Sequence, residues 1–218
     1  MKTKILSVLI VAIITAFTAQ AQDSGMRVGI LGGVNLQNLT GEDYDGEKLD
    51  MKLSPGFHVG VNLMIPIAPD FNFQPGLLFS GKGAKSEEGS TDATIKLSYI
   101  ELPLNLLYRA QLGEGYVMIG FGPYLGYGIG GKIKSEGVEI DVKFKNEVGS
   151  GDPDNVAYFK GFDAGANIFV GYEMSSGLFL QLNSQLGLLN ISPDYVGETG
   201  DSGTIKNTGF GLSVGYRF

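Results

Sequence analysis

The chain has 218 residues, a formal net charge of −7 and 18% charged side chains, below the roughly 25% of ordinary soluble domains. It contains no cysteine and no tryptophan, which excludes disulfides, thiolate catalysis and cysteine-based metal sites. The acidic balance argues against a nucleic-acid partner, because binding to phosphates rests on basic side chains.

The first 21 residues have the pattern of a secretory signal peptide. Lys2 and Lys4 precede an apolar run over residues 5–17, and Ala19-Gln20-Ala21 follows as an A-x-A cleavage site. The alternative is a retained membrane anchor, but the run is shorter than the roughly 20 residues of a spanning helix. The sequence therefore predicts a signal peptide over residues 1–21 and one mature domain over residues 22–218.

Eight segments of the mature chain alternate with a two-residue period. In the last of them Phe210, Leu212 and Val214 alternate with glycine and serine. Such a period places one set of side chains on each face of a sheet. None of the eight apolar faces carries a charge. The segments are residues 26–36, 57–65, 71–80, 99–109, 117–129, 162–173, 178–189 and 209–218.

The distribution of bulk over the two faces predicts a transmembrane barrel. The apolar face holds most of the large side chains, whereas the opposite face is rich in glycine and amides and carries all the charges of these segments. A charge facing lipid at the midplane costs about 2–4 kcal/mol, so a lipid-facing wall excludes it. We expect an all-β fold, an eight-stranded antiparallel transmembrane β-barrel with apolar side chains outside and polar ones in the lumen.

Short and long links alternate between these segments. The short ones lie around residues 68–70, 113–115 and 175–176, and the long ones cover residues 37–54, 81–94, 130–158 and 192–206. Outer-membrane barrels have short periplasmic turns and long external loops, so both termini are predicted to be periplasmic. Residues 138–144 alternate as well and are predicted to extend the wall as a hairpin. An aromatic girdle is predicted at the periplasmic end, formed by Tyr108, Tyr116, Tyr172, Tyr216 and Phe218.

The last strand ends on an aromatic residue and resembles the C-terminal signal by which outer-membrane barrels are recognised by their assembly machinery. The matching residues are Gly211, Leu212, Val214, Tyr216 and Phe218. The barrel-assembly machinery is therefore an expected partner, together with outer-membrane lipid.

The whole mature chain resembles the porin-family, PorT-type outer-membrane β-barrel proteins of Gram-negative bacteria. The likeness lies in "GILGGVNL" (29–36), "FQPGLLFSGKGAK" (73–85), "YIELPLNL" (99–106), "GFGPYLGY" (120–127) and the closing strand. It implies the barrel fold, and for some members a link to protein secretion or surface export.

The inward-facing charges form the candidate site. Arg27, Arg109, Glu173 and Arg217 are placed near the periplasmic end, with Glu101, Asp163 and His58 higher in the lumen. A buried charge persists only when it is paired, so we interpret the set as a structural ion-pair network that fills the lumen. A selectivity ring is the alternative. Eight strands enclose a lumen that side chains can fill, although the inward glycines leave open that water occupies part of it.

Catalytic, metal and cofactor sites are not predicted. His58 is the only histidine, no serine neighbours it in the sequence, and Glu101 or Asp163 could orient it only across the lumen. Barrel enzymes that act on lipids use a histidine beside a serine. The acidic stretch over residues 42–47 superficially resembles a Ca²⁺ loop, but the distal glutamate that such a loop requires is not at its spacing. Residues 151–155 form another acidic turn. We interpret both as solvated loops.

These patterns predict a non-enzymatic protein of the cell outer membrane. Its role would be structural, or binding and adhesion at the surface through external loops that meet an unidentified ligand or protein. A narrow porin-like channel or a component of a secretion apparatus is the alternative, and a lipid-modifying barrel enzyme is a third.

Overall fold

The computed structural model describes residues 25–43, 45–88, 91–196 and 203–218, and the predicted signal peptide lies outside them. Among the described residues, no helix is long and apolar enough to cross a membrane. The described chain is built from β1 (Arg27–Glu42), β2 (Lys52–Ala68), β3 (Phe71–Glu88), β4 (Thr91–Leu112), β5 (Gly115–Ser135), β6 (Val138–Phe144), β7 (Glu147–Val148), β8 (Ala157–Phe159), β9 (Phe162–Glu173), β10 (Leu178–Gly187), β11 (Asp194–Tyr195) and β12 (Thr204–Arg217).

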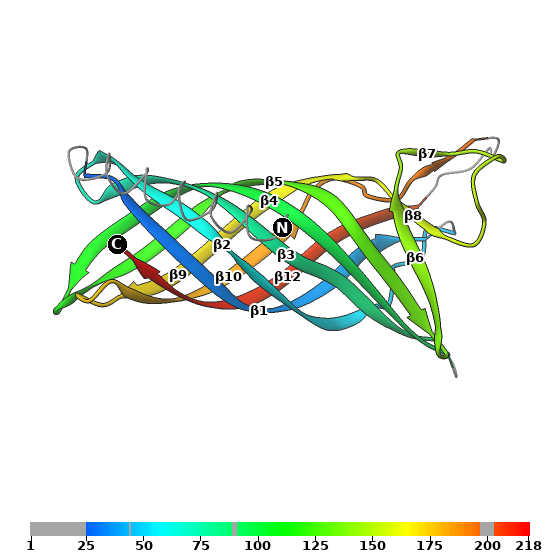
Figure 1. Ribbon diagram of the computed structural model, residues 1–218, viewed down its shortest axis with the longest axis horizontal. Coiled ribbons are helices and arrows are strands. Elements are labelled where there is room, and N and C mark those ends of the chain that lie inside the picture. Colours follow the sequence, from blue (N-terminus) through cyan, green and yellow to red (C-terminus); the bar gives the residue numbers. More distant parts are fainter. Residues whose placement is uncertain (1–24, 44, 89–90, 197–202) are drawn as a thin grey trace, which may run out of the picture.

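Eight of these strands pair into one closed antiparallel barrel, and Figure 1 shows the tilted strands of its wall. The order around the ring is β1-β2-β3-β4-β5-β9-β10-β12, and β12 pairs with β1 from Glu42↔Thr204 to Gly29↔Arg217. All eight predicted strands and the predicted fold class are confirmed. The strands join at one end through short turns, which by the arrangement general to outer-membrane barrels is the periplasmic end.

The predicted facing of the strands is confirmed along the ring. Val34 is 61% exposed whereas its neighbour Asn35 is 3% exposed, and Leu182 is 60% exposed whereas Gln181 is 8% exposed. An exposed apolar outer wall around a buried polar interior is the reverse of a soluble domain. It is the arrangement that a lipid environment stabilises.

Several strands are longer than the membrane requires. β4 has 22 residues and β5 has 21, against 9–11 for a tilted spanning strand. The predicted long link over residues 81–94 is therefore wrong, because β3 continues to Glu88 and β4 begins at Thr91. The outward face turns polar there, which ends the apolar signal but not the ladder of backbone hydrogen bonds.

The predicted wall hairpin within residues 130–158 is confirmed. β6 pairs with the end of β5 through a two-residue turn, in which Glu136 and Gly137 both have positive φ, 49° and 83°. Two positive φ values match a type I′ turn, whose twist suits adjoining strands. β8 then pairs with β6 in parallel, and β7 pairs with β11.

Inward glycines make room for aromatic rings in the lumen. A methyl group on Gly120 would overlap the ring of Phe169, and one on Gly215 would overlap the ring of Phe179. These glycines are therefore positions of close packing rather than empty space.

The aromatic girdle is confirmed on the outer wall with one exception. Tyr108, Tyr172, Tyr216 and Phe218 are 36–56% exposed at the periplasmic end. Tyr116 was predicted wrongly: its ring lies 3.3 Å from the guanidinium carbon of Arg109, which is on the lumen side. It occupies the other face because Val117 begins the outward series of β5.

Candidate functional site

A layer of charges crosses the lumen at its periplasmic end. Glu173 lies at the end of β9 and forms ion pairs with three arginines. Its Oε1 lies 2.6 Å from Arg27 Nη1 and 2.9 Å from Arg109 Nη2, and its Oε2 lies 2.7 Å from Arg217 Nη1. The side chains of Glu173 and Arg217 are 1% and 0% exposed, those of Arg109 and Arg27 16% and 30%. The centre of the layer is therefore buried, and only the arginines at its rim are partly exposed to solvent.

An apolar plug lies directly behind this layer. Arg217 Nη1 is 3.3 Å from the sulfur of Met64 and 3.7 Å from that of Met118, and its guanidinium carbon is 5.1 Å from the centre of the Phe179 ring. Leu31, Leu107 and Phe169 complete a buried cluster with these three residues. A charged solute is costly to bring into such apolar surroundings.

A second charged layer crosses the lumen nearer the external end. Lys82 Nζ lies 2.6 Å from Glu101 Oε1 and 3.1 Å from Asp163 Oδ2, and all three side chains are at most 2% exposed. Tyr124 and Asn207 donate hydrogen bonds to the same Asp163 oxygen, at 3.2 and 2.9 Å. One cation between two carboxylates leaves the layer with a formal charge of −1, while the periplasmic layer has three cations around one carboxylate.

Lys82 is a charged lumen residue that the sequence did not predict. It lies in the stretch that was predicted to be an external link, yet Ser80, Lys82 and Ala84 continue the inward series of β3. The signal was present in the alternation. It was hidden because Gly81 and Gly83 replace the bulky outward residues there.

His58 lies between the two layers and belongs to neither. Its Nε2 is 2.7 Å from Ser213 Oγ and its Nδ1 is 2.6 Å from Asn35 Oδ1. The absence of a serine beside His58 in the sequence was therefore misleading, because closure of the barrel brings β12 to the same height. Neither Glu101 nor Asp163 bonds to it: they bond to Lys82 instead.

A small polar cavity of about 50 Å³ lies beside His58 in the middle of the lumen. Four amide atoms that face it are buried without a hydrogen-bond partner among the described residues, namely Gln37 Oε1, Asn62 Oδ1, Gln74 Nε2 and Asn105 Oδ1. A buried water needs about 10–15 Å³ and several polar partners. The cavity thus suits a few water molecules, and a solute of drug size does not fit.

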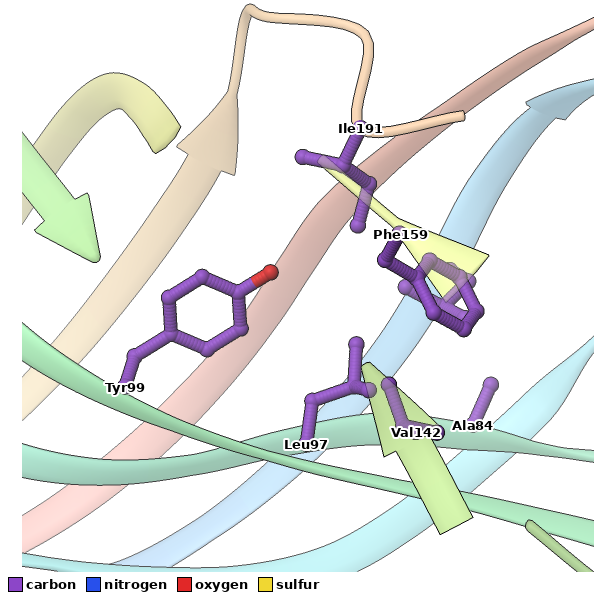
Figure 2. Packing of buried hydrophobic residues seen from close by; sticks show 7 residues of the cluster. Ala84, Leu97, Tyr99, Val142, Phe159 and Ile191 are labelled. Atoms are coloured by element: carbon purple, nitrogen blue, oxygen red, sulfur yellow. The ribbon is translucent and has the colours of Figure 1, made fainter. Parts of the chain in front are cut away.

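The external end carries a packed body that we call the platform. It consists of the ends of β1, β3, β4 and β12 with β6, β8 and the links beside them. Figure 2 shows Leu97, Tyr99, Val142, Phe159 and Ile191 turned toward one another, and together with Leu39 and Ala84 they are at most 6% exposed. This satellite core packs Ile191 of an external link against β6, β8 and the ends of the barrel strands.

The acidic stretches of the platform have local structural roles. Asp43 Oδ1 accepts hydrogen bonds from the backbone of Asp45 and Glu47, at 3.0 and 2.9 Å, and Asp152 bonds to Lys145 at 2.5 Å and to the backbone of Gly149 at 2.8 Å. In the described part of the chain, no group of three or more histidine, aspartate or glutamate residues could hold a metal ion.

A known family accounts for this architecture. The family described as "Outer membrane protein beta-barrel domain" matches residues 19–192. The chain belongs to this family. As a member of it, the protein is an outer-membrane β-barrel, in agreement with the exposed apolar wall. It matches none of the curated proteins with which it was compared.

Several solved structures are similar to this chain at low sequence identity. The chain is similar to Ail, the attachment invasion locus protein of Yersinia pestis, solved with the heparin analogue sucrose octasulfate, with 15% identity over 88% of this chain and 99% of that one and a TM-score of 0.42. It is also similar to OprG of Pseudomonas aeruginosa, with 9% identity over 88% and 95% and a TM-score of 0.49. For Neisserial surface protein A, the identity is 13% over 89% and 98%, with a TM-score of 0.44.

Proposed function

We propose that this protein is a closed outer-membrane barrel that acts as a binding or adhesion module at the cell surface, with the platform as its binding part. One observation carries the proposal: two charged layers and an apolar plug occupy the lumen, while the external end is built into a packed body. This arrangement favours a role for the external surface over transport through the lumen.

The packing of the platform supports binding by a fixed surface. Lys160 pairs with Asp194 at 3.0 Å, and Lys145 pairs with Asp152, so two of the external links are tied down as well as packed. A surface that is already ordered loses less conformational entropy when it binds.

The experiment compares cells that produce the wild-type protein with cells that produce the Phe159→Ala variant. Phe159 is 5% exposed inside the platform, so its truncation should loosen the platform and reduce attachment of the cells to protein-coated or glycan-coated surfaces. Phe162→Ala is the matched control, because Phe162 is 50% exposed on the barrel wall. Both variants should keep the heat resistance of the barrel in SDS. Equal attachment by all three strains would contradict the proposal.

A narrow channel is the second candidate, and the central cavity favours it. The cavity is lined by amides that suit water, and the layers on either side are held by ion pairs that could rearrange. Conductance recordings separate this candidate from the binding module.

The narrower PorT-type resemblance would add a role in protein export in a Gram-negative cell. In that case the mature barrel, residues 22–218 after cleavage of the signal peptide, should co-purify with other export components from native membranes. We also keep the proposal that Gly211, Leu212, Val214, Tyr216 and Phe218 form the signal for the assembly machinery. Deletion of Phe218 should then lower the fraction of chains that reach the folded, heat-resistant form.

An enzymatic role is not part of the proposal. Ser213, His58 and Asn35 are bonded in the order in which a histidine can activate a hydroxyl, but Ser213 is 0% exposed and the adjoining cavity measures about 50 Å³. A fluorophosphonate reagent should leave Ser213 of the folded protein unlabelled, and labelling would favour the enzyme reading.

A further inference from the structure

One lysine and two carboxylates meet in the second charged layer, away from solvent. Lys82 Nζ lies 2.6 Å from Glu101 Oε1 and 3.1 Å from Asp163 Oδ2, and the three side chains are at most 2% exposed. The rings of Tyr99 and Tyr124 lie beside the ammonium group, with their centres 5.4 and 4.3 Å from Nζ. An amine, a carboxyl group that it can attack and a second carboxyl group that can carry protons are therefore held together in a buried site.

The two oxygens of Asp163 differ in their surroundings. Besides its contact with Lys82, Oδ2 accepts hydrogen bonds from Tyr124 Oη at 3.2 Å and from Asn207 Nδ2 at 2.9 Å. Oδ1 is buried and has no hydrogen-bond partner among the residues that the structure describes. Donors fixed on one oxygen stabilise the negative charge that develops there when a nucleophile adds to the carboxyl carbon. The other oxygen, Oδ1, is then the one that can leave.

Glu101 is placed to carry protons. Its Oε2 accepts a hydrogen bond from Gln185 Nε2 at 3.1 Å, and its Oε1 contacts the Lys82 ammonium group. A carboxylate within hydrogen-bond reach of an amine can take up the proton of that amine. Glu101 also lines the central cavity of about 50 Å³, which suits a few water molecules. A water molecule released beside Glu101 can therefore be accommodated.

We propose that Lys82 and Asp163 become joined by an amide bond after the barrel has folded, with Glu101 as the acid and base. Glu101 takes one proton from the Lys82 ammonium group and passes it to Asp163 Oδ1. The neutral amine is the nucleophile, and its nitrogen forms a bond to Cγ of Asp163. Glu101 then moves a second proton from this nitrogen to Oδ1, the Cγ–Oδ1 bond breaks, and one water molecule leaves.

The reaction balances without any further reagent. The ammonium group supplies both protons of the water, Asp163 supplies its oxygen, and Glu101 is a carboxylate again at the end. The formal charge of the layer is −1 before and after, and the N–H of the new amide can donate to Glu101 in place of the ammonium group.

Burial and positioning both favour this reaction. Buried charges are costly, and the reaction replaces one ammonium group and one carboxylate with a neutral amide. Groups that are held in contact also react as if at a very high concentration. Lys82 and Asp163 are 81 positions apart in the sequence, so the fold is what brings them together. The bond is therefore expected in the folded protein and not in the unfolded chain.

The bond would cross the lumen beneath the platform. It joins β3 to β9, which are separated around the ring by β4 and β5. The inference does not depend on the proposed binding function, because it concerns the lumen and holds whether or not the platform binds a partner.

The test measures the intact mass of the mature protein before and after refolding from urea into detergent micelles. The unfolded chain should have the full mass of its sequence, and the folded wild-type protein should be lighter by one water molecule. Proteolysis of the folded protein should give one linked fragment that contains both Lys82 and Asp163. After boiling in SDS, the cross-linked chain should migrate ahead of the linear one, because the loop between the two residues stays closed.

Two variants serve as controls. Lys82→Arg keeps a positive charge between the carboxylates, but arginine stays protonated and is not a nucleophile. Glu101→Gln keeps the size and polarity of the side chain but cannot take up the proton. Both variants should retain the full mass of their sequences after refolding and should migrate as linear chains after boiling.

A folded wild-type protein with the full mass of its sequence would overturn the proposal. So would a water loss that Lys82→Arg shares or that hydroxylamine reverses, because a succinimide at an aspartate would then be its source. Water loss by Glu101→Gln would refute the role of Glu101 as the acid and base. The linked fragment of the wild-type protein decides the case independently of how well either variant folds.

Discussion

Glu173 is the residue whose removal tests the closed lumen most severely. Glu173→Ala deletes the carboxylate that three arginines share, and Arg217 is 0% exposed among methionine and phenylalanine side chains. Removing one partner of a buried pair costs about 3–5 kcal/mol, because the remaining charge is left without compensation. Arg27→Ala is the control: this side chain is 30% exposed and Glu173 keeps two partners, so we expect a loss of about 1 kcal/mol or less.

The assay is urea unfolding of the protein in phospholipid vesicles, followed by the mobility difference between folded and unfolded forms in SDS. A double variant sharpens it. Arg217→Met places a thioether among Met64, Met118 and Phe179, so Glu173→Ala/Arg217→Met should be more stable than Glu173→Ala alone, a coupling that a double-mutant cycle measures. If Glu173→Ala were no less stable than Arg27→Ala, or kept its heat resistance while conducting a stable current, the charges would line a pore.

Three further outcomes follow from the fold. Leu182 is 60% exposed on the lipid face, so Leu182→Arg should cost about 2–4 kcal/mol of insertion free energy and lower the assembled fraction. Gln185 on the same strand lies 3.1 Å from a lumen carboxylate, so Gln185→Arg should assemble normally. Equal effects of the two variants would show that the assignment of lipid and lumen faces is wrong. Gly120→Ala should destabilise the barrel by about 1–3 kcal/mol in urea unfolding, because a methyl group there overlaps an aromatic ring, while Gly130→Ala, with open space around it, should not. Hydrogen bonds from two lysines lower the pKa of Glu139 from 4.5 to about 2. The ionised Glu139 should therefore stabilise the β5–β6 hairpin fully above pH 4.5, and this stabilisation should be lost as the pH falls to about 2. Pepsin cleavage at the hairpin turn should increase over that range, and unchanged cleavage would contradict the prediction.

The barrel could be predicted from the sequence because membrane insertion imposes a strict rule at every position. Residues such as Val61 and Leu104 face lipid, so charge is excluded there and the two-residue period stays visible. The same rule explains where the prediction stopped. Beyond Phe79 and Ile100 the wall leaves the lipid, outward lysines become acceptable, and the alternation of β3 and β4 no longer reads as apolar against polar.

The site could be predicted only in part, because pairing inside a barrel depends on which strands meet. The sequence indicated charges at the periplasmic end, and the structure brings Arg27, Arg109 and Arg217 onto Glu173. The sequence could not predict the contact between His58 and Ser213, because the two residues are 155 positions apart. Their contact follows from the closure of β12 on β1, a long-range pairing that no local pattern encodes.

The central claim is that two charged layers close the lumen, one around Glu173 and the other around Lys82. Single-channel recording of the refolded mature protein in planar bilayers tests it most directly. We expect no steady current at moderate voltage over a range of salt concentrations, and at most brief events. A stable, reproducible conductance that changes on mutation of Lys82 or Glu173 would contradict the claim and establish a channel.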